Sequence, residues 1–365
     1  MLKEYDCKLI FEDGLEIKGY SFGAWQEKVC EIVFNTSMVG YQEILSDPSY
    51  TYQAVVMTYP LIGNYGMAAD DYETIYPTIG AFVVGEYNDL PSNFRSITSL
   101  DGIMKKHNIP GISGIDTRKL TRYIRDNGSQ KVLLASIDKK TEDGVKLLKE
   151  SIIPTDAVSK VTRPAMCQAN IMDPKYKVVA IDCGMKENIV RSLNRRGCSV
   201  TIVPYNTSAE FIENLGPDGV FISNGPGDPT DVPEVIDTIK ALHGKFPIFG
   251  ICLGHQIISL SYGAKTYKLK FGHRGGNHPV KDINTGKVEI TSQNHSYAVD
   301  EKSLENTPLK VTHINILDNT VEGVECVKDK VFSVQYHPES APGPEDSGYL
   351  FDKFIKMMQE GKNNA

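Results

Sequence analysis

Hydrophobic residues change their spacing along the chain. Before residue 150 they form short β-branched and aromatic runs broken by Gly, Pro and Asn, a pattern typical of strands. The predicted strands include Ile32–Phe34, Ala54–Thr58 and Ala81–Gly85, and the predicted helices are Asn93–Lys106 and Asp116–Asp126. Residues 1–150 are therefore predicted to form a mixed α+β domain.

The pattern after residue 175 alternates strand and helix. The predicted strands are Val178–Ile181, Val200–Val203, Val220–Ser223 and Pro247–Ile251, with helices at Lys186–Arg196 and Val232–Leu242. This alternation predicts an α/β domain over residues 175–365, with a doubly wound, mostly parallel sheet and its chemistry at the carboxyl ends of the strands. Residues 151–174, which contain three prolines and no clear periodicity, are predicted to be a linker.

Composition narrows the class of protein. The 365 residues are 41% hydrophobic and 23% charged, which is ordinary for a soluble protein with room for two domains. The net charge of −7 argues against nucleic acid as a partner. The absence of a long apolar run argues against a signal peptide or membrane span. Seven cysteines without a C-x-x-C pair indicate reduced thiols. We therefore expect a cytoplasmic protein.

Cys252 has the surroundings of a nucleophile. Gly250-Ile251-Cys252-Leu253-Gly254 is a G-x-C-x-G sequence that runs from a predicted strand into a helix. Small residues on either side permit a strained strand-to-helix turn, and the helix N-terminus favours thiolate. The Leu253 N–H could stabilise an oxyanion. The alternative for any cysteine is a buried structural residue, which is how we interpret the other six.

His337 is the best placed of eight histidines to act as a general base. It lies just beyond a predicted strand, Val331–Gln335, in the sequence His337-Pro338-Glu339. Residues i and i+2 of an extended segment project to the same side, so Glu339 can orient the imidazole. His255 and His295 are competitors for this role. His255 falls in the first turn of the helix after Cys252, where the positive helix end disfavours a protonated base.

Two polar segments could contact a substrate. The segment Phe221–Pro229 contains Gly225 and Gly227, whose N–H groups could approach a ligand, and Gly227 could be a second oxyanion donor. The segment Ile290–Ala298, interpreted as a loop, contains Asn294. The segment Phe271–Pro279 is similar and has two histidines, but it lacks a third ligand at metal spacing. No metal site and no nucleotide-binding motif are predicted.

Together these motifs resemble those of the class I glutamine amidotransferases, and within them the small subunits of carbamoyl phosphate synthetase. The segments that single out the small subunits are Phe34–Met38, Gly40–Tyr50, Thr58–Pro60, Gly63–Asn64 and Gly114–Arg118. The resemblance covers nearly the whole chain. It implies hydrolysis of glutamine through a thioester, and passage of ammonia to a large subunit that binds bicarbonate, ATP and Mg. No cofactor is expected in this chain.

The resemblance also assigns site residues. It implies Cys252 as nucleophile, His337 as base and Glu339 as its orienter. The glutamine contacts that it implies are Ser49, Gly225, Gly227, Leu253, Gln256, Asn294, Ser296 and Tyr297. The chain departs from the family pattern at Ser296, usually glycine, and at Arg274, Ala341 and Glu345 near the rim. Residues 1–150 are expected to contact the large subunit, and the product is expected to serve arginine or pyrimidine synthesis.

Three alternatives remain open at this stage. An amidotransferase serving another synthetase would share the triad, but the N-terminal segments disfavour it. A cysteine peptidase or deglycase on a similar sheet is disfavoured by the H-P-E ending and the glutamine loops. A catalytically inactive scaffold is disfavoured by the complete set of Cys252, His337 and Glu339.

Overall fold

The computed structural model describes residues 4–363 and divides into two compact units. The N-terminal unit runs to Pro154 and includes Lys270–Arg274. The C-terminal unit contains Thr155–Leu269 and the chain from Gly275 onward. The predicted linker, 151–174, therefore divides between the two units, and most of it groups with the second. It contains a short helix, α5 (Ala157–Val161), and a strand, β10 (Cys167–Ala169).

The N-terminal unit is built on a closed barrel with strand order β1-β2-β8-β6-β4-β3-β9. These strands are β1 (Cys7–Phe11), β2 (Glu16–Gly23), β3 (Lys28–Asn35), β4 (Gln53–Met57), β6 (Ala81–Val83), β8 (Pro110–Ser113) and β9 (Lys131–Ser136). The pairs β3–β4, β4–β6 and β6–β8 are parallel and the others antiparallel. The remaining elements are β5 (Leu61–Ile62), β7 (Glu86–Tyr87), α1 (Tyr41–Ser46), η1 (Pro48–Tyr50), α2 (Leu100–Lys106), α3 (Thr117–Asn127) and α4 (Thr141–Glu150).

The helix predicted over Asn93–Lys106 is wrong in its first half, because α2 begins only at Leu100. The Asn93 side chain accepts a hydrogen bond from the Arg95 N–H at 2.8 Å, which offers the backbone an alternative to the helix. The hydroxyl of Ser99 then caps α2 by accepting from the Gly102 N–H at 3.1 Å, as is typical of an N-cap serine. Residues 93–99 are consequently an irregular surface segment.

The C-terminal unit contains a ten-stranded sheet in the order β10-β12-β11-β13-β14-β19-β18-β16-β15-β17. The five adjacent parallel strands are β12 (Cys198–Pro204), β11 (Tyr176–Asp182), β13 (Gly219–Ile222), β14 (Ile248–Ile251) and β19 (Val331–Val334). Beyond β19 the sheet continues with β18 (Val321–Cys326), β16 (Val288–Val299), β15 (Thr266–Asp282) and β17 (Lys310–Asn315).

The prediction of a mostly parallel sheet describes only these five strands. The pairings β10–β12, β18–β19, β16–β18, β17–β18 and β15–β17 are antiparallel. A parallel pair needs a long crossover connection, whereas only residues 316–320 separate β17 from β18. Such a short turn permits antiparallel pairing alone.

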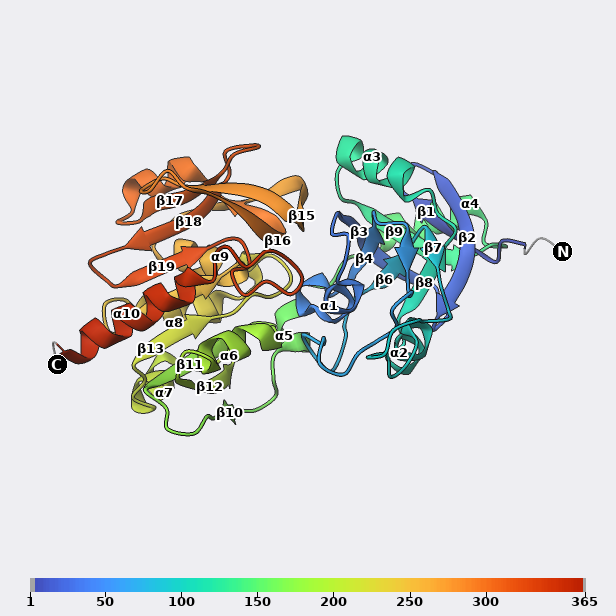
Figure 1. Ribbon diagram of the computed structural model, residues 1–365. Coiled ribbons are helices and arrows are strands. Elements are labelled where there is room, and N and C mark those ends of the chain that lie inside the picture. The colour runs from blue at the N-terminus through green and yellow to red at the C-terminus, as the bar shows by residue number, and fades with distance from the viewer. Residues whose placement is uncertain (1–3, 364–365) are drawn as a thin grey trace. The chain divides into compact units, whose positions relative to one another are not determined.

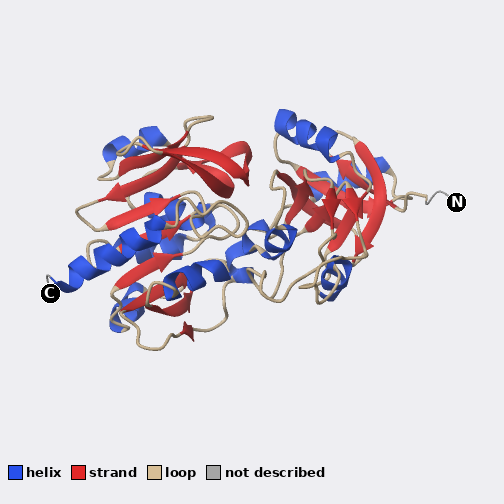
Figure 2. Cartoon of the chain, in the orientation of Figure 1, coloured by secondary structure: helices blue, strands red, loops and turns tan. Residues whose placement is uncertain are grey.

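Helices cover both faces of the parallel strands, as expected for a doubly wound sheet (Figures 1 and 2). Side chains of Val178 and Ala180 pack with α6 (Glu187–Asn194) and α10 (Tyr349–Asn363), whereas those of Val179 and Ile181 pack with α8 (Pro233–Leu242) and α9 (Leu253–Ser261). This alternation follows from the two-residue period of a strand. The remaining elements of the unit are α7 (Ala209–Asn214), η2 (Pro229–Asp231) and η3 (Glu301–Asn306).

The register of the parallel strands brings four chain segments to one edge of the sheet. Ile222 of β13 pairs with Gly250 of β14, and Ile251 of β14 pairs with Val334 of β19. The residues that follow β11, β13, β14 and β19 therefore meet where open α/β sheets bind ligands. Separately, none of the helices within residues 4–363 combines the length and apolar character needed to cross a bilayer.

Candidate active site

Cys252 occupies a strained turn between β14 and α9. Its backbone angles are φ 55° and ψ −104°, which few non-glycine residues adopt. Its N–H donates to the Val334 carbonyl at 2.9 Å and so ties the turn to β19. A Cβ on Gly254 would lie 2.4 Å from the Ile222 carbonyl oxygen, and one on Gly250 would lie 2.8 Å from the Gly254 backbone. Both flanking glycines are thus required by close backbone packing.

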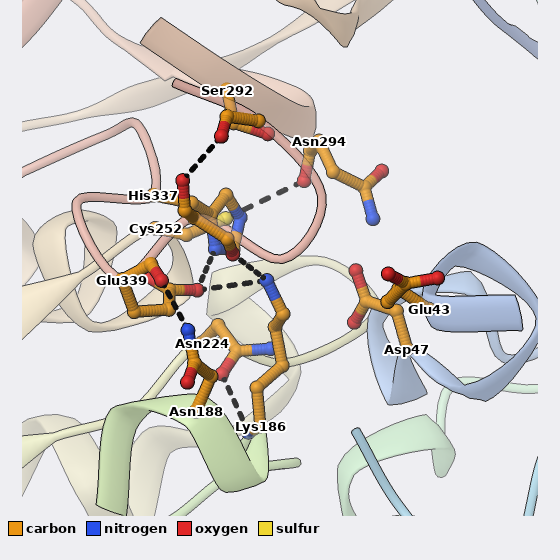
Figure 3. A network of polar contacts seen from close by, with 12 residues as sticks. Glu43, Asp47, Lys186, Asn188, Asn224, Cys252, Ser292, Asn294, His337 and Glu339 are labelled. Carbon is orange, nitrogen blue, oxygen red and sulfur yellow. Dashed lines mark hydrogen bonds and ion pairs between the residues drawn. The ribbon is translucent and has the colours of Figure 1, made fainter. Parts of the chain in front are cut away.

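His337 and Glu339 lie just past the end of β19 and contact each other. His337 Nδ1 and Glu339 Oε1 are 2.6 Å apart, and both side chains are almost completely buried. The His337 N–H donates to the Ser292 carbonyl at 2.9 Å, which fixes the backbone beneath the ring. Figure 3 shows the Cys252 sulfur beside the imidazole. The structure therefore brings the three predicted triad residues together.

The charges of this group are strongly coupled. Burial alone lowers the pKa of His337, but Glu339 and the neighbouring Cys252 outweigh burial and raise it to about 10, while Lys186 opposes them. Burial raises the pKa of Glu339, but Lys186 and His337 lower it to about 2. At neutral pH the pair is therefore imidazolium and carboxylate.

The two competing histidines are occupied elsewhere. Burial, and secondarily His313, lowers the pKa of His255 to about 3, and its Nδ1 lies 2.9 Å from the Ser333 hydroxyl. His295 Nδ1 lies 2.8 Å from the Tyr297 carbonyl oxygen, and Nε2 lies 3.1 Å from Gln293 Oε1. Among these histidines, only His337 has a carboxylate on one ring nitrogen and the Cys252 sulfur beside it.

Two backbone N–H groups near Cys252 are available to a ligand. Leu253 begins α9, and among the described residues no hydrogen bond engages its N–H. The same holds for Gly227, whose φ is +91°. A Cβ on Gly225 would lie 2.1 Å from the Cys183 carbonyl oxygen, so this position also requires glycine. The Gly225–Gly227 turn is thus shaped by its glycines.

The segment that contains Asn294, Ser296 and Tyr297 is not a loop but part of β16. Its many polar side chains predict a loop from the sequence. In the structure, however, Thr291, Gln293 and His295 are buried and hydrogen-bonded. Likewise, the polar segment 271–279 lies within β15. Ser296 has no left-handed φ, so the position does not require glycine.

Three predicted glutamine contacts surround Cys252 through β16 and α9. Cys252 Sγ donates to the Asn294 carbonyl at 3.5 Å. Gln256 Nε2 donates to the Tyr297 carbonyl and to Gln335 Oε1, both at 2.9 Å. Ser49 lies in η1 of the N-terminal unit, where Asp47 accepts from its N–H at 2.9 Å. Its contact with glutamine stays a prediction.

Sequence reasoning missed three residues that hold the group together. Lys186 Nζ donates to Glu339 Oε1 and to the Ser340 carbonyl, both at 2.9 Å. Asn188 donates to the Glu339 carbonyl, and Asn224 Oδ1 accepts from the Lys186 N–H at 3.2 Å (Figure 3). The sequence signal for Lys186 was its position four residues after Asp182, the last residue of β11, but the helical spacing placed it only as the first residue of the predicted helix Lys186–Arg196.

Comparison with known proteins agrees with this geometry. Residues 179–357 match the family model described as glutamine amidotransferase class-I, so the unit with the buried triad belongs to a known class of domain. Residues 9–134 match the model described as the CPSase domain of the carbamoyl-phosphate synthase small chain. The carbamoyl phosphate synthase small chain of Fusobacterium nucleatum is 56% identical over 97% of this chain and 98% of its own length.

Two further relatives point the same way. The pyrimidine-specific small chain of Halalkalibacterium halodurans is 54% identical over 98% of both chains. The small chain of Bacillus thuringiensis is 53% identical over 98% of this chain and 97% of its own length. The chain belongs to the carbamoyl phosphate synthase small chain family, the glutamine-hydrolysing subunits. The resemblance found in the sequence is thereby confirmed.

Proposed function

We propose that this chain hydrolyses L-glutamine to glutamate and ammonia through a thioester on Cys252, and that it delivers the ammonia to a large subunit. The large subunit would use it with bicarbonate and ATP to make carbamoyl phosphate. The observation that carries this proposal is the convergence of Cys252, His337 and Glu339 at the carboxyl ends of two adjacent parallel strands. Family membership supports the partner and the substrate.

In the first half-reaction, the Cys252 thiolate attacks the side-chain carbonyl carbon of glutamine. The C–N bond breaks, His337 gives its proton to the nitrogen, and ammonia leaves. The N–H groups of Leu253 and Gly227 are proposed to stabilise the oxyanion, each contributing roughly 3–4 kcal/mol in comparable sites. Glu339 keeps His337 in the tautomer and orientation that both half-reactions need.

In the second half-reaction, His337, now neutral, takes a proton from water, and the hydroxide attacks the thioester carbon. The C–S bond breaks, glutamate leaves, and the thiolate–imidazolium pair is restored. Gln256, Asn294, Ser296, Tyr297 and Ser49 are proposed to contact glutamine. ATP and Mg are proposed to bind only the large subunit, so that this chain needs no cofactor of its own.

The N-terminal unit is proposed to provide the large-subunit interface. Several large hydrophobic side chains in its loops are exposed, and exposed apolar side chains that lie together in a patch are typical of protein–protein interfaces. The most exposed are Met38, Val39, Ile75, Tyr76, Leu90, Phe94, Ile97 and Ile152. The name of the Halalkalibacterium relative makes pyrimidine synthesis the first destination to test for the product.

The decisive experiment is a pull-down of the tagged chain from its native cell, followed by a carbamoyl phosphate assay on the eluate. The proposal predicts that a large ATP-binding subunit is recovered, and that Cys252→Ala abolishes the glutamine-dependent reaction while added ammonia restores it. Recovery of a different synthetase would retain the glutaminase chemistry but refute the assignment of the product. Activity in Cys252→Ala would refute the thioester.

A further inference from the structure

Two strands of the C-terminal unit have their polar and apolar sides reversed. On β16 the side chains of Glu289 and Thr291 point into the unit, and they are 3% and 2% exposed. The alternating residues Val288 and Ile290 point outward and are 48% and 42% exposed. An antiparallel strand with one solvated side normally places apolar residues inside and polar residues outside. The polarity of β16 is therefore inverted.

The strand β17 repeats this inversion. Asn315 is completely buried, whereas Ile314 is half-buried and Ile316, directly after β17, is 44% exposed. The strand β15 lies between β16 and β17. Its exposed Lys281 pairs with Ile314, and the carbonyl of Pro279 accepts from the Ile316 N–H at 3.0 Å. Three adjacent strands thus share an outer face, which consists of Pro279, Val288, Ile290, Ile314 and Ile316 around Lys281.

Hydrogen bonds on the inner side fix this arrangement. Glu289 accepts from the Ser347 hydroxyl at 2.9 Å and pairs with Lys287 at 3.0 Å, while Thr291 donates to the His278 carbonyl at 2.9 Å. A slip of one residue would turn Val288 and Ile290 inward but would break these contacts. In Figure 1 β15 and β17 lie above β19, away from α8. The apolar outer face is therefore a defined feature of the sheet.

We propose that the outer face is a docking surface for the large subunit, which covers it with an apolar surface that carries an acidic side chain opposite Lys281. This inference rests on the proposed function, because it names a second surface through which the proposed partner binds. It also assigns a role in assembly to the unit that contains the triad.

The charge of Lys281 distinguishes a different protein from a second copy of this chain. Lys281 is exposed on the middle strand of the three, beside aliphatic side chains. Two outer faces packed together would bring two ammonium groups into one desolvated interface, where like charges are strongly unfavourable. A partner with a carboxylate at this position would instead form a complementary pair.

The size of the outer face points the same way. A patch of this kind exposes on the order of 300–600 Å², whereas a stable interface buries about 800 Å² on each partner. The outer face alone is therefore too small to hold a second copy of the chain, but it suits one part of a larger contact. The N-terminal unit is already proposed to bind the large subunit, so the same partner supplies the remaining area.

The alternative explanation is strand propensity, because β-branched residues favour strands whatever they face. The first test therefore replaces Ile290 and Ile316 by threonine, which is also β-branched but polar. Ile290→Thr/Ile316→Thr should unfold at the same urea concentration as the wild type. Its affinity for the large subunit, measured by isothermal titration, should fall about 10–100-fold.

Two single variants sharpen this test. Lys281→Glu should lower the affinity about tenfold, and the loss should be larger at low salt than at high salt, because an attraction has become a repulsion. Val327→Thr is the matched control. Val327 is 74% exposed in the turn between β18 and β19, outside the outer face, so its replacement should leave the affinity unchanged.

A labelling experiment locates the large subunit on the surface. The background is Cys167→Ala, which removes an exposed cysteine that would react. In this background Val288→Cys should react with a maleimide in the free chain and about tenfold more slowly in the complex, because a covered side chain is shielded from water. Val327→Cys should react equally in both. If Ile290→Thr/Ile316→Thr does not fold, Lys281→Glu and this labelling decide the question.

The outcomes separate this inference from the proposed function. Unchanged affinity in Ile290→Thr/Ile316→Thr, or unchanged labelling of Val288→Cys in the complex, overturns the docking surface even though the wild type still binds the large subunit. A free chain that sediments as a dimer, and that Ile290→Thr/Ile316→Thr converts to a monomer, also overturns it, because a second copy then occupies the outer face. A wild-type chain that binds no large subunit overturns the proposed function, and this inference with it.

Discussion

Both units of this chain expose some large hydrophobic side chains, but most of the highly exposed ones belong to the N-terminal unit, whereas the C-terminal unit buries a group of charges around Cys252. The C-terminal unit buries charge: Lys186, His337 and Glu339 are each less than 5% exposed. The N-terminal unit leaves large hydrophobic side chains in its loops exposed, among them Phe94 at 98% and Leu90 at 78%. Buried charge is typical of sites of chemistry, and exposed apolar surface is typical of interfaces with a partner. Variants around Cys252 and variants in the N-terminal loops should therefore fail in different assays.

The largest effect is expected from Cys252→Ala. Removing a nucleophile from a triad costs on the order of 10⁴–10⁶-fold in rate, so glutamine hydrolysis in the complex should become undetectable. Carbamoyl phosphate synthesis from free ammonia should persist, because it bypasses this unit. Cys167→Ala is the control, since Cys167 is an exposed cysteine of the same unit. Equal loss in the two variants would contradict the assignment of Cys252.

A smaller effect, on folding rather than on chemistry, is expected from Gly254→Ala. The new Cβ would lie 2.4 Å from the Ile222 carbonyl oxygen. The C-terminal unit should therefore lose about 1–3 kcal/mol of unfolding free energy. Far-UV circular dichroism reports the unfolding of both units and should show the loss. Fluorescence of Trp25, the single tryptophan, reports only the N-terminal unit and should not change.

The control for Gly254→Ala is Gly361→Ala in α10. A Cβ at Gly361 would meet nothing within 4 Å, and alanine is the better helix former. This variant should be neutral or stabilised by up to about 1 kcal/mol. If both substitutions destabilise the unit equally, the close packing behind the Cys252 turn is not the cause.

Phe94→Ser tests the other side of the comparison. Because the side chain is 98% exposed, both unfolding transitions should stay within about 0.5 kcal/mol of the wild type. If Phe94 is buried in the interface, the affinity for the large subunit should fall about tenfold. This corresponds to a loss of about 1.4 kcal/mol of binding free energy. Isothermal titration measures this directly. Met172→Ser, at an exposed position of the C-terminal unit, is the control, and an equal loss there would count against the N-terminal interface.

The weakest of these effects concerns pH and stability. The pKa of His337 is raised from 6.5 to about 10, so its pairing with Glu339 contributes stability that is fully present below pH 6.5 and is lost as pH rises toward 10. The stability difference between wild type and His337→Gln should therefore shrink from pH 6 to pH 10 in urea unfolding followed by circular dichroism. A constant difference across this window would show that the ion pair is not linked to folding.

The sequence was informative where burial dictates the pattern. The strands and helices predicted between residues 178 and 251 all appear, because their apolar runs fill the two faces of one sheet. The meeting of Cys252, His337 and Glu339 also followed, because parallel strands end at a common edge. Neither conclusion needed knowledge of distant contacts.

Other features depended on contacts that sequence spacing does not reveal. The strand β16 was interpreted as a loop because its buried polar side chains satisfy one another across the sheet. Lys186 was predicted only as the first residue of a helix, because nothing in the sequence around it indicates a contact with Glu339, 153 residues away. The helix before Leu100 was predicted too long, because the Asn93 side chain accepts a hydrogen bond from the backbone N–H of Arg95 and so favours a turn.

The pairing of β14 with β19 has a consequence for how this chemistry could be controlled. Ile251 and Val334 are paired across the two strands, and Cys252 and His337 follow them within three residues. Adjacent positions on a strand are about 3.3 Å apart and face opposite sides, so the two strands can change register only in whole steps that destroy the arrangement. The two strand ends that carry nucleophile and base thus cannot slide past each other gradually. The strand pairing therefore fixes the backbone beneath both residues, and any change in their separation has to come from side-chain rotation or from the residues that follow the two strands.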